Sequence, residues 1–375
     1  MKIIVLGSGK IGSVMGLDFS KRGAEITLSD IDISRAKKAA DAINADAVRF
    51  DTTDHSSMVN TLREYDLVMG ALPGDYGFNA LKAVVDARKN MVDVSFTPED
   101  PTTLDEAAKK AGITIIPDCG VAPGLSNMLV GYGSSKLDMV EEAKIMVGGI
   151  PETEVPPLGY TITWSADGLI DEYIRDVSII KDGRMTQVPA LSGLENIEFP
   201  GVGTLESFYT DGLRTLVQSF PDTKNLYEKT LRYPGHVEKV KLLRELGFFG
   251  EEPVMVQGKE VMPKLVSARI FEKSLTKPEI GDILAMMIEV SGVKDGKKKG
   301  YRYHVLEYHD HTSGVSAMAR TTAYTASIVA GILVDGGIKG KGVIPMEKLG
   351  ADHRFVEKVF KEHGKRSVEI KETAF

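Results

Sequence analysis

Three glycines near the start of the chain have the spacing of a phosphate-binding turn. Gly7, Gly9 and Gly12 follow an apolar run, residues 2–6, and precede a helical pattern. The first glycine permits a sharp turn, the second lets a pyrophosphate approach the backbone, and the third lets the helix pack closely. The free N–H groups of the helix start would face the phosphates. The pattern predicts cofactor contacts from Gly7, Gly9, Lys10, Ile11 and Gly12, and the alternative is a tight turn without a ligand.

An acidic residue follows the second apolar run at the place where a ribose would lie. Residues 26–28 are apolar and the run ends at Asp30. A carboxylate there accepts the hydrogen bond of a ribose 2′-OH and repels a 2′-phosphate. We therefore expect NAD as the cofactor. Arg35, close behind, could accept a 2′-phosphate, so NADP is the alternative cofactor.

The elements that position this turn alternate along the first third of the chain. Strand patterns recur at residues 47–50, 67–69, 91–94 and 113–116, with a helical pattern before each of them. Strands joined by helices predict a parallel sheet with right-handed crossovers. We expect a doubly wound Rossmann fold with the strand order 3-2-1-4-5-6.

Ligands of such sheets bind beyond the carboxyl ends of the strands, so the residues that follow each strand are candidates. Asp51 follows the third strand and is expected near the adenine. The loop after the fourth strand, with Ala71, Leu72 and Pro73, is expected along the cofactor. Asp93, Ser95 and Asp118 end the next two strands, beside the expected nicotinamide. Ordinary turn chemistry is the alternative for each of these positions.

The bulk composition limits the classes of partner. The chain has 375 residues, a net charge of −7 and no long basic run, which argues against nucleic acid and anionic membranes. Residues 317–334 are apolar, but Arg320 and several hydroxyls indicate a buried core helix rather than a membrane span. Cys119 is the only cysteine, which excludes an internal disulfide, and we expect it to be buried. With a strand at the N-terminus and no signal peptide, we expect a cytoplasmic enzyme.

The pattern changes after about residue 132. Strand patterns at 144–147, 160–164, 177–180 and 185–188 follow, and residues 181–184 (KDGR) predict a hairpin turn. A second hairpin with a basic tip is predicted at residues 294–299. Together with a helix over 237–246, these patterns predict a second α+β domain with a largely antiparallel sheet.

Several segments resemble motifs of the saccharopine dehydrogenase-like family, above all of its NAD(P)-dependent L-lysine 6-dehydrogenase branch. The segments are 118–127 (DCGVAPGLSN), 163–173 (TWSADGLIDEY), 230–236 (TLRYPGH) and 342–345 (GVIP). The resemblance implies a Rossmann domain of residues 1–122 with 315–375, and a substrate and dimerisation domain of residues 123–314. It also implies an active-site cleft between the domains and a homodimer.

The resemblance also implies amine oxidation linked to NAD(P), and the residues suggest how it would run. The amine must lose a proton first, because an ammonium has no lone pair to expel a hydride. Arg232 is expected to pair with a substrate carboxylate, Glu172 to hold an ammonium, and Trp164 to line the substrate site. The candidates for acid–base work are Asp93, Asp118, Tyr173 and His236.

Three functions follow as hypotheses. The first is oxidative deamination of the ε-amine of L-lysine to the 6-semialdehyde, with release of ammonia. The second is a saccharopine reductase-type reaction between an amine and a semialdehyde, whose three substrate carboxylates would require more arginines. The third is a non-catalytic NAD-binding sensor or scaffold. We expect no metal site, because His309 and His311 lack the further ligands that zinc needs.

Overall fold

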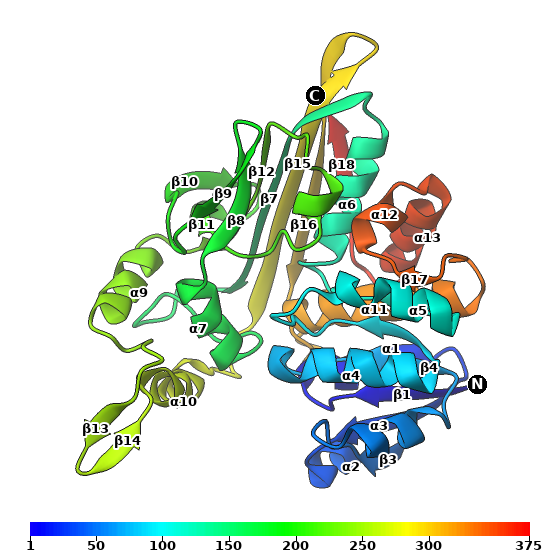
Figure 1. The fold of residues 1–375 in the computed structure, drawn as a ribbon. Coiled ribbons are helices and arrows are strands. Elements are labelled where there is room, and N and C mark those ends of the chain that lie inside the picture. The colour runs from blue at the N-terminus through cyan, green and yellow to red at the C-terminus, as the bar shows by residue number, and fades with distance from the viewer. The chain divides into compact units, whose positions relative to one another are not determined.

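The computed structural model describes all residues from 1 to 375, which divide into two units (Figure 1). The first unit contains Met1–Tyr132 and Ala319–Val368, and the second contains Gly133–Met318 and Glu369–Phe375. The chain leaves the first unit inside helix α6 (Leu125–Ser135) and returns within helix α11 (Ala317–Val334). Each unit is therefore built from segments that are far apart in the sequence.

A parallel sheet of seven strands forms the centre of the first unit. Its order is β17-β6-β5-β4-β1-β2-β3. The order 3-2-1-4-5-6 predicted for the first six strands is confirmed, and β17 adds a further parallel strand beside β6. The strands are β1 (Lys2–Leu6), β2 (Glu25–Asp30), β3 (Asp46–Arg49), β4 (Leu67–Gly70), β5 (Asn90–Asp93), β6 (Thr114–Ile116) and β17 (Gly342–Val343).

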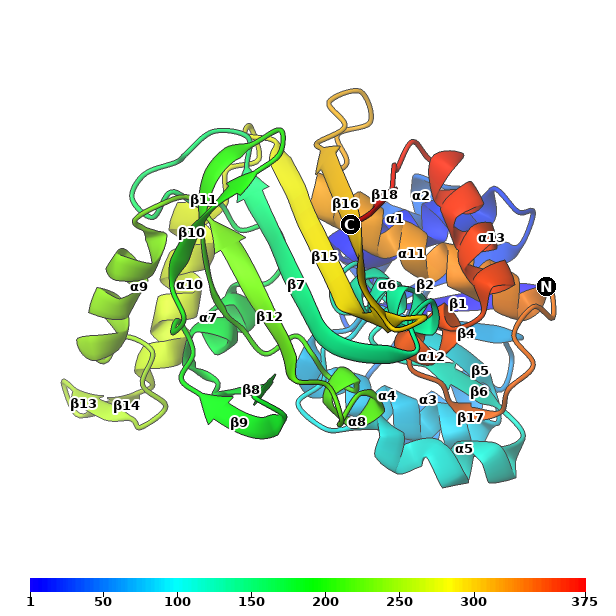
Figure 2. The same ribbon diagram turned by 90° about the horizontal axis from the view of Figure 1, so that it is seen from above.

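Helices cover both faces of this sheet, as a doubly wound fold requires. Figure 2 shows α3, α4 and α5 on one side of the strands and α1, α2, α11 and α13 on the other. The apolar side chains of β1, β4 and β5 pack under α3 and α4 in one buried cluster. The helices are α1 (Lys10–Ser20), α2 (Ile33–Asp41), α3 (His55–Leu62), α4 (Gly74–Ala87), α5 (Asp105–Ala111), α12 (Met346–Gly350) and α13 (His353–Gly364), with a 3₁₀ turn at Pro101–Leu104.

Helix α11 has the length and apolar composition of a membrane span, and 72% of it is buried inside the protein. The side chains of Ala323, Thr325 and Val329 are all fully buried. The hydroxyl of Thr325 donates to the carbonyl of Thr321, one turn earlier, so a polar side chain is accommodated within the fold. The helix thus has the burial of a core helix, as the sequence indicates.

A second sheet of nine strands organises the second unit. Its path is β10-β11-β12-β7-β15-β16-β18, and β8 and β9 branch from β12. Only the β12–β7 pair is parallel, so the prediction of a largely antiparallel sheet is confirmed. The strands are β7 (Met139–Pro151), β8 (Val177–Lys181), β9 (Arg184–Val188), β10 (Glu195–Phe199), β11 (Gly203–Tyr209), β12 (Asn225–Arg232), β15 (Asp282–Lys294), β16 (Lys297–Tyr308) and β18 (Lys371–Ala374).

Both predicted hairpins are present. Asp182 and Gly183 join β8 to β9, and Asp295 and Gly296 join β15 to β16. All four residues have positive φ, which is the conformation of a two-residue type I′ turn. The predicted strand at residues 160–164 is wrong. Its backbone makes single hydrogen bonds, from Tyr160 to Val155 and from Ile162 to Leu275, instead of a ladder.

Helices α7 (Ala166–Ile174), α9 (His236–Glu245) and α10 (Pro263–Leu275) pack their apolar faces into one cluster of the second unit. A small separate hairpin, β13 (Val254–Val256) with β14 (Lys259–Val261), lies between α9 and α10 in the chain. A short helix, α8 (Leu216–Ser219), precedes β12.

The end of the chain corrects the expected extent of the nucleotide domain. Residues 315–375 were expected to belong to that domain as a whole. Strand β18 instead pairs with β16, and Gly300 and Phe375 exchange two backbone hydrogen bonds, so residues 369–375 belong to the second unit. A last strand with exposed, charged side chains has no apolar pattern that would predict where it pairs.

Candidate functional site

The glycine turn of the first unit has the geometry of a phosphate-binding site. Gly7 has φ +92°, and its N–H donates to the carbonyl of Ser29 (2.8 Å). A Cβ on Gly12 would lie 1.8 Å from the carbonyl oxygen of Gly7, whereas a Cβ on Gly9 would meet no atom within 4 Å. Helix α1 begins after Gly9 without a side-chain cap, so its first N–H groups are available. Space and donors for a pyrophosphate therefore coincide at Gly9.

Asp30 is held in place by backbone N–H groups, one of which belongs to the glycine turn. It is buried at the end of β2, and its carboxylate accepts the N–H groups of Ser8 (3.1 Å) and Asp32 (3.0 Å). Arg35 is exposed, with its guanidinium 3.7 Å from the same carboxylate. Ser8 was not among the predicted cofactor residues, and its hydroxyl also donates to the carbonyl of Ser29. The glycine turn and the end of β2 thus form one rigid element.

The loop after β4 lies against the same turn. A Cβ on Gly7 would lie 2.4 Å from the carbonyl oxygen of Ala71. The N–H of Ala71 donates to the carbonyl oxygen of Leu6. The N–H of Leu72 donates to the hydroxyl of Ser95 (3.2 Å), which in turn donates to Asp93 (2.9 Å). Pro73 directly precedes α4. The structure therefore brings these predicted cofactor residues to one end of the sheet.

Asp93 and Asp118 have surroundings that suit positioning. Asp93 is buried, and its carboxylate also accepts the N–H of Ser95 (3.1 Å). The N–H of Cys119 donates to the Asp93 carbonyl, which ties the ends of β5 and β6 together. Asp118, two residues after the end of β6, adopts φ +50°. Their predicted catalytic role stays a prediction.

Cys119 is fully buried, and burial raises the pKa of its thiol well above the usual value, as suits a core residue.

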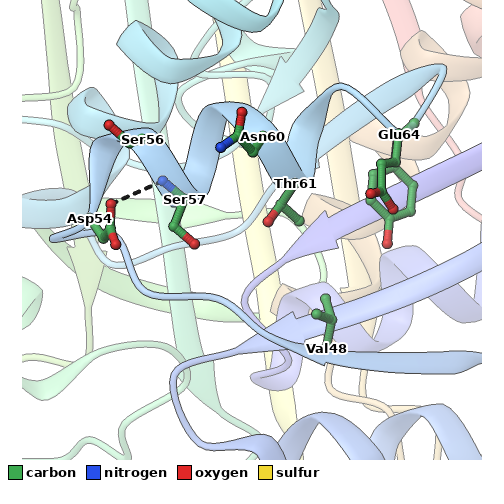
Figure 3. Close-up of a pocket in the computed structure, with 8 residues that line it drawn as sticks. Val48, Asp54, Ser56, Ser57, Asn60, Thr61 and Glu64 are labelled. Carbon is green, nitrogen blue, oxygen red and sulfur yellow. Dashed lines mark hydrogen bonds between the residues drawn. The ribbon is translucent and has the colours of Figure 1, made fainter.

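Asp51 makes a local turn. Its carboxylate accepts the backbone N–H and the hydroxyl of Thr53, and pairs with Arg49 (3.1 Å). The hydrogen bonds from Thr53 lower the pKa of Asp51. A pocket of about 620 Å³ lies nearby over α3, and its lining includes Val48, Asp54 and Asn60 (Figure 3). Asp54 already caps α3 at Ser57, and none of the predicted cofactor residues lines this pocket.

A nicotinamide dinucleotide fits the first unit on these observations. The open position at Gly9, the uncapped helix start and the buried Asp30 match the pyrophosphate and ribose of such a cofactor.

In the second unit, strand β12 presents four side chains to one face at a period of two, from Leu226 to Arg232. Arg232 is buried. Its Nη2 lies 3.3 and 3.4 Å from the oxygens of Glu172, and its guanidinium stacks on Tyr160 with 4.6 Å to the ring centre. Its Nε has no hydrogen-bond partner. Burial is the largest single influence and opposes the charge, but Glu172, Tyr160 and Tyr173 together outweigh it and raise the pKa of Arg232, so the guanidinium is charged.

Glu172 and Arg232 were predicted to bind opposite ends of a substrate, and the structure pairs them with each other. Both come from motifs that are 60 residues apart, on α7 and β12. The pair is loose for an arginine–carboxylate contact, because both distances exceed the usual 2.7–2.9 Å. Arg232 therefore retains donor capacity for a second anion.

Tyr173 and His236 form a buried pair beside Arg232. The Tyr173 hydroxyl lies 2.8 Å from His236 Nε2, and His236 Nδ1 lies 2.9 Å from the carbonyl of Leu158. Because a carbonyl can only accept, Nδ1 carries the proton and Nε2 accepts the tyrosine hydroxyl. Burial and the nearby Arg232 lower the pKa of His236 to about 3, and burial raises that of Tyr173 well above its usual range. The pair is neutral and suits positioning, and its predicted catalytic role stays a prediction.

Glu228, which was not among the predicted site residues, lies four residues before Arg232 on the same face of β12. It is 4% exposed, and its Oε2 has no hydrogen-bond partner. Its carboxyl lies over Gly212, where an added Cβ would be 1.6 Å from Oε1. Burial, with the nearby Glu172 and Asp211, raises the pKa of Glu228 to about 8. The i, i+2, i+4 spacing back from Arg232 was the signal that could have found it.

Two further motif residues have structural partners. Asp171, next to Glu172, accepts from Arg175 (2.7 Å) and pairs with Lys264 (2.8 Å). Trp164 is 36% exposed, and its ring covers Gly168, where a Cβ would lie 2.4 Å from it. The hydroxyl of Ser165 caps α7 at Gly168. The predicted substrate contact of Trp164 stays a prediction.

The structure brings together no group of three or more His, Cys, Asp or Glu side chains suited to a metal ion. His309 and His311 turn to different carboxylates. His309 lies 3.4 Å from Asp282, which caps α11, and His311 lies 3.0 Å from Glu152.

Two family models match the chain over nearly its whole length. Residues 3–116 match the model described as "Saccharopine dehydrogenase NADP binding domain". Residues 120–368 match the model described as "Saccharopine dehydrogenase C-terminal domain". The first match covers the glycine turn, Asp30 and the β4 loop, and the second covers Glu172, Glu228 and Arg232.

Curated relatives are similar at low identity. Saccharopine dehydrogenase [NADP(+), L-glutamate-forming] of Pyricularia oryzae is 27% identical over 286 residues, which is 71% of this chain and 63% of the relative. The Schizosaccharomyces pombe enzyme of the same name is 24% identical over 319 residues, 79% of this chain and 69% of the relative. Alpha-aminoadipic semialdehyde synthase of Arabidopsis thaliana is 25% identical over 68% of this chain. The chain thus spans about two thirds or less of the length of these relatives.

Among solved structures, the apo histidine-tagged saccharopine dehydrogenase (L-Glu forming) from Saccharomyces cerevisiae has the same fold. The TM-score is 0.81 at 19% sequence identity, with 100% of this chain and 99% of that chain covered. At this identity the likeness establishes the fold.

Proposed function

The chain belongs to the saccharopine dehydrogenase family, and we propose that it is an NAD(P)-dependent oxidoreductase that acts on the carbon bearing the side-chain nitrogen of a lysine-derived amino acid. The first unit would hold the dinucleotide and the second unit would hold the amino acid. The observation that carries the proposal is Arg232, a buried, charged guanidinium whose Nε lacks a partner. A substrate α-carboxylate satisfies such a group bidentately.

The reaction balances in the same way for two substrates. The carbon–nitrogen bond R–CH₂–NH–R′ loses a hydride and a proton to become an imine, and water then releases the aldehyde R–CHO and the amine H₂N–R′. The bound dinucleotide supplies the hydride acceptor, NAD(P)⁺. With saccharopine the released amine is glutamate, and with free lysine it is ammonia. The two candidate functions therefore share the oxidised carbon and differ only in the leaving amine.

Saccharopine is the first candidate because the curated relatives are named as saccharopine dehydrogenases that form L-glutamate. Its three carboxylates need several cations. In the second unit Arg175 pairs with Asp171, and Arg175 and Arg214 both lie close enough to Asp211 to lower its pKa, against the larger effect of burial. These arginines would have to exchange acidic partners for substrate carboxylates.

Free lysine is the second candidate, and Glu228 is the observation that favours it. A buried carboxyl whose pKa lies near 8 gains a partner when an ammonium approaches, because the two charges then stabilise each other. Glu172 and Asp211 add negative charge to the same region. Such a region suits a substrate with two ammonium groups and one carboxylate better than a tricarboxylate.

The two neutral residues behind the guanidinium would act by position. Tyr173 and His236 hold each other, and His236 is anchored to the carbonyl of Leu158. These two hydrogen bonds would hold α7, which carries Glu172, in place beside α9. The acid–base residue that deprotonates the amine is not assigned by this geometry.

The test uses the full chain with each cofactor and each amine. Formation of reduced nicotinamide is followed at its absorbance maximum with saccharopine or L-lysine, and released glutamate and ammonia are measured separately. Turnover with saccharopine and release of glutamate support the first candidate. Turnover with lysine alone and release of ammonia support the second. Dinucleotide binding without turnover of either amine would refute the proposed reaction and favour the sensor or scaffold hypothesis.

Glu228→Gln refines the choice between the amines. If Glu228 holds an ammonium, the variant should raise the KM for lysine about tenfold or more while kcat changes less. The matched control is Glu245→Gln, which changes an exposed acid on α9. Equal KM values for wild type and Glu228→Gln would remove Glu228 from substrate binding.

A further inference from the structure

The start of helix α9 is held by a carboxylate from a distant strand. The N-cap of the helix is Gly235, with φ +87°, which has no side chain to accept the first N–H groups. Glu206 on β11 takes this part. One of its carboxylate oxygens accepts the N–H of Gly235 (2.9 Å), and the other accepts the N–H of Val237 (2.6 Å). A helix cap normally comes from the N-cap residue itself, whereas this one lies 29 and 31 positions away from its partners.

The geometry at Glu206 suits a carboxylate and no other side chain. Glu206 is 4% exposed, so its carboxylate is removed from water. Two N–H groups and the positive end of the α9 dipole compensate for the loss of hydration. Because each oxygen serves a different N–H, an amide, which has a single acceptor oxygen, could replace only one of the two hydrogen bonds.

Glu206 is also the cross-strand neighbour of Arg232. The two residues are directly opposite each other on β11 and β12. Opposite residues of an antiparallel pair point to the same face of the sheet, with Cβ atoms about 5 Å apart. Burial first, and then the charge of Arg232, lower the pKa of His236, so the guanidinium lies close to the helix start. Without Glu206, the guanidinium and the positive end of the helix would face each other without compensation.

A short turn, residues 233–235, connects two residues of the arginine site. Arg232 is the last residue of β12, and His236 is the first residue of α9. At one end of the turn the hydroxyl of Tyr233 donates to the carbonyl of Pro151 (2.9 Å). At the other end Glu206 holds the helix start. A shift of the helix start would therefore move the guanidinium and the imidazole together.

We propose that Glu206 is a positioning residue of the substrate site. It fixes the turn after β12, and it occupies a helix start that would otherwise attract an anion, so the substrate carboxylate is directed to Arg232. Glu206 acts through Arg232 and does not contact the substrate. The proposal rests on the proposed function for the identity of the bound carboxylate, and its structural part is independent of that function.

Glu206→Gln in the full chain tests the proposal by kinetics. The variant keeps the size of the side chain and removes its charge and one accepted N–H. With the amine that wild type oxidises, KM should rise about tenfold while kcat falls less than about threefold, because the turn supports substrate binding. The affinity for NAD, measured by calorimetry, should stay unchanged. Glu206→Asp keeps the charge on a shorter side chain and should recover part of the loss in KM.

The matched control is Asp352→Asn, which weakens a helix cap elsewhere. Asp352 accepts the N–H groups of Arg354 (3.0 Å) and Phe355 (3.3 Å) at the start of α13. Both amide variants should unfold at a lower temperature than wild type, because each loses part of a cap. Only Glu206→Gln should change KM. Equal KM values for wild type and both variants would show that Glu206 is a structural cap alone and would overturn the proposal.

A second measurement does not depend on turnover. Nitrogen NMR of the histidine rings reports which ring nitrogen of His236 carries the proton, and the signal is identified by its loss in His236→Asn. Glu206→Gln should shift or broaden this signal, and Asp352→Asn should leave it in place. An unchanged His236 signal in Glu206→Gln would overturn the proposal. If wild type oxidises neither amine, the proposed function fails, and the His236 signal still decides the role of Glu206.

Discussion

Two regions of the molecule are built in opposite ways: the glycine turn of the first unit, and the face of β12 in the second unit where Arg232 and Glu228 lie beside Glu172, which we call the arginine face. The turn is made of backbone within six residues, Gly7 to Gly12, and its requirement is the absence of side chains. The arginine face is made of side chains that meet across 60 residues or more, as Glu172 and Arg232 do, and Tyr173 and His236. A backbone site leaves its signature in local spacing. A side-chain site leaves only residue types, and the fold decides which of them meet.

The two regions also differ in what holds them. At the turn, Asp30 accepts the N–H groups of Ser8 and Asp32 and keeps its place without a ligand. At the arginine face, Arg232 Nε and Glu228 Oε2 are buried without partners. Unsatisfied buried polar atoms cost about 1–3 kcal/mol each, so they persist where a function uses them. We therefore expect the turn to tolerate little change and the arginine face to gain its remaining contacts from a substrate.

The largest effect should come from removing the guanidinium. Arg232→Ala should lower kcat/KM for the amino acid by about a thousandfold, or about 4 kcal/mol, and leave the dinucleotide affinity unchanged. It also leaves the Glu172 carboxylate without its partner, which should lower the free energy of unfolding by about 3 kcal/mol. Steady-state kinetics, calorimetry with NAD and thermal unfolding measure the three effects.

The double variant Arg232→Met with Glu172→Gln separates folding from function, since it removes the pair together. It should unfold at a higher temperature than Arg232→Ala and remain inactive. Arg302→Ala is the matched control, because Arg302 pairs with Glu289 on the same sheet with its side chain 48% exposed. If Arg232→Ala weakened dinucleotide binding as much as substrate use, the division of labour between the units would be wrong.

A second effect concerns the pH dependence of stability. The Glu228 carboxyl has a pKa of about 8 in the folded protein and an ordinary value of 4.5 in the unfolded chain. The folded protein thus holds a proton that unfolding releases, and wild-type stability should fall as pH rises from 4.5 to 8. Glu228→Gln does not titrate, so its free energy of unfolding should exceed that of wild type by about 5 kcal/mol above pH 8 and match it below pH 4.5.

Thermal unfolding between pH 4 and 9 checks this expectation. Glu245→Gln, on the exposed side of α9, should run parallel to wild type at every pH. A constant offset between Glu228→Gln and wild type would mean that Glu228 is ionised in the fold, and the contrast between a satisfied turn and an unsatisfied face would lose its best evidence.

A smaller effect should appear at the turn. Gly9→Ala should raise the dissociation constant of the dinucleotide about tenfold, because the new methyl group occupies space that is open for the pyrophosphate. Its unfolding temperature should stay within a few degrees of wild type. Gly364→Ala, at an equally open position at the end of α13, should change neither quantity. Unchanged affinity of Gly9→Ala in a fluorescence titration would move the phosphate away from this turn.

The smallest effect belongs to the buried neutral pair. Tyr173→Phe leaves His236 Nε2 without its donor and should cost about 1–2 kcal/mol of stability. A positioning role predicts a modest loss of kcat with an unchanged pH profile. Loss of one limb of that profile would instead identify the pair as acid–base residues. Tyr76→Phe, which changes an exposed tyrosine on α4, is the control.

The sequence by itself determined most of the first unit. Apolar runs at regular intervals specify alternating strands and helices, and the order of the six strands follows from short right-handed crossovers. The glycine spacing and Asp30 could be read without a structure because their function depends on backbone shape and on neighbours nearby in the chain. The two β hairpins were predictable for the same reason, since Asp-Gly turns set their own geometry.

The tertiary structure alone decided the arginine face and the end of the chain. Residues 160–164 alternate like a strand but form no ladder of backbone hydrogen bonds with another strand. Strand β18 joins a sheet, and its charged residues give no pattern that would predict this pairing. Arg232 and Glu172 were recognisable as types, but their pairing, and the burial of Glu228 beside them, depend on how α7 packs over β12. Burial and charge pairing are properties of contacts between distant segments, and local sequence patterns do not carry them.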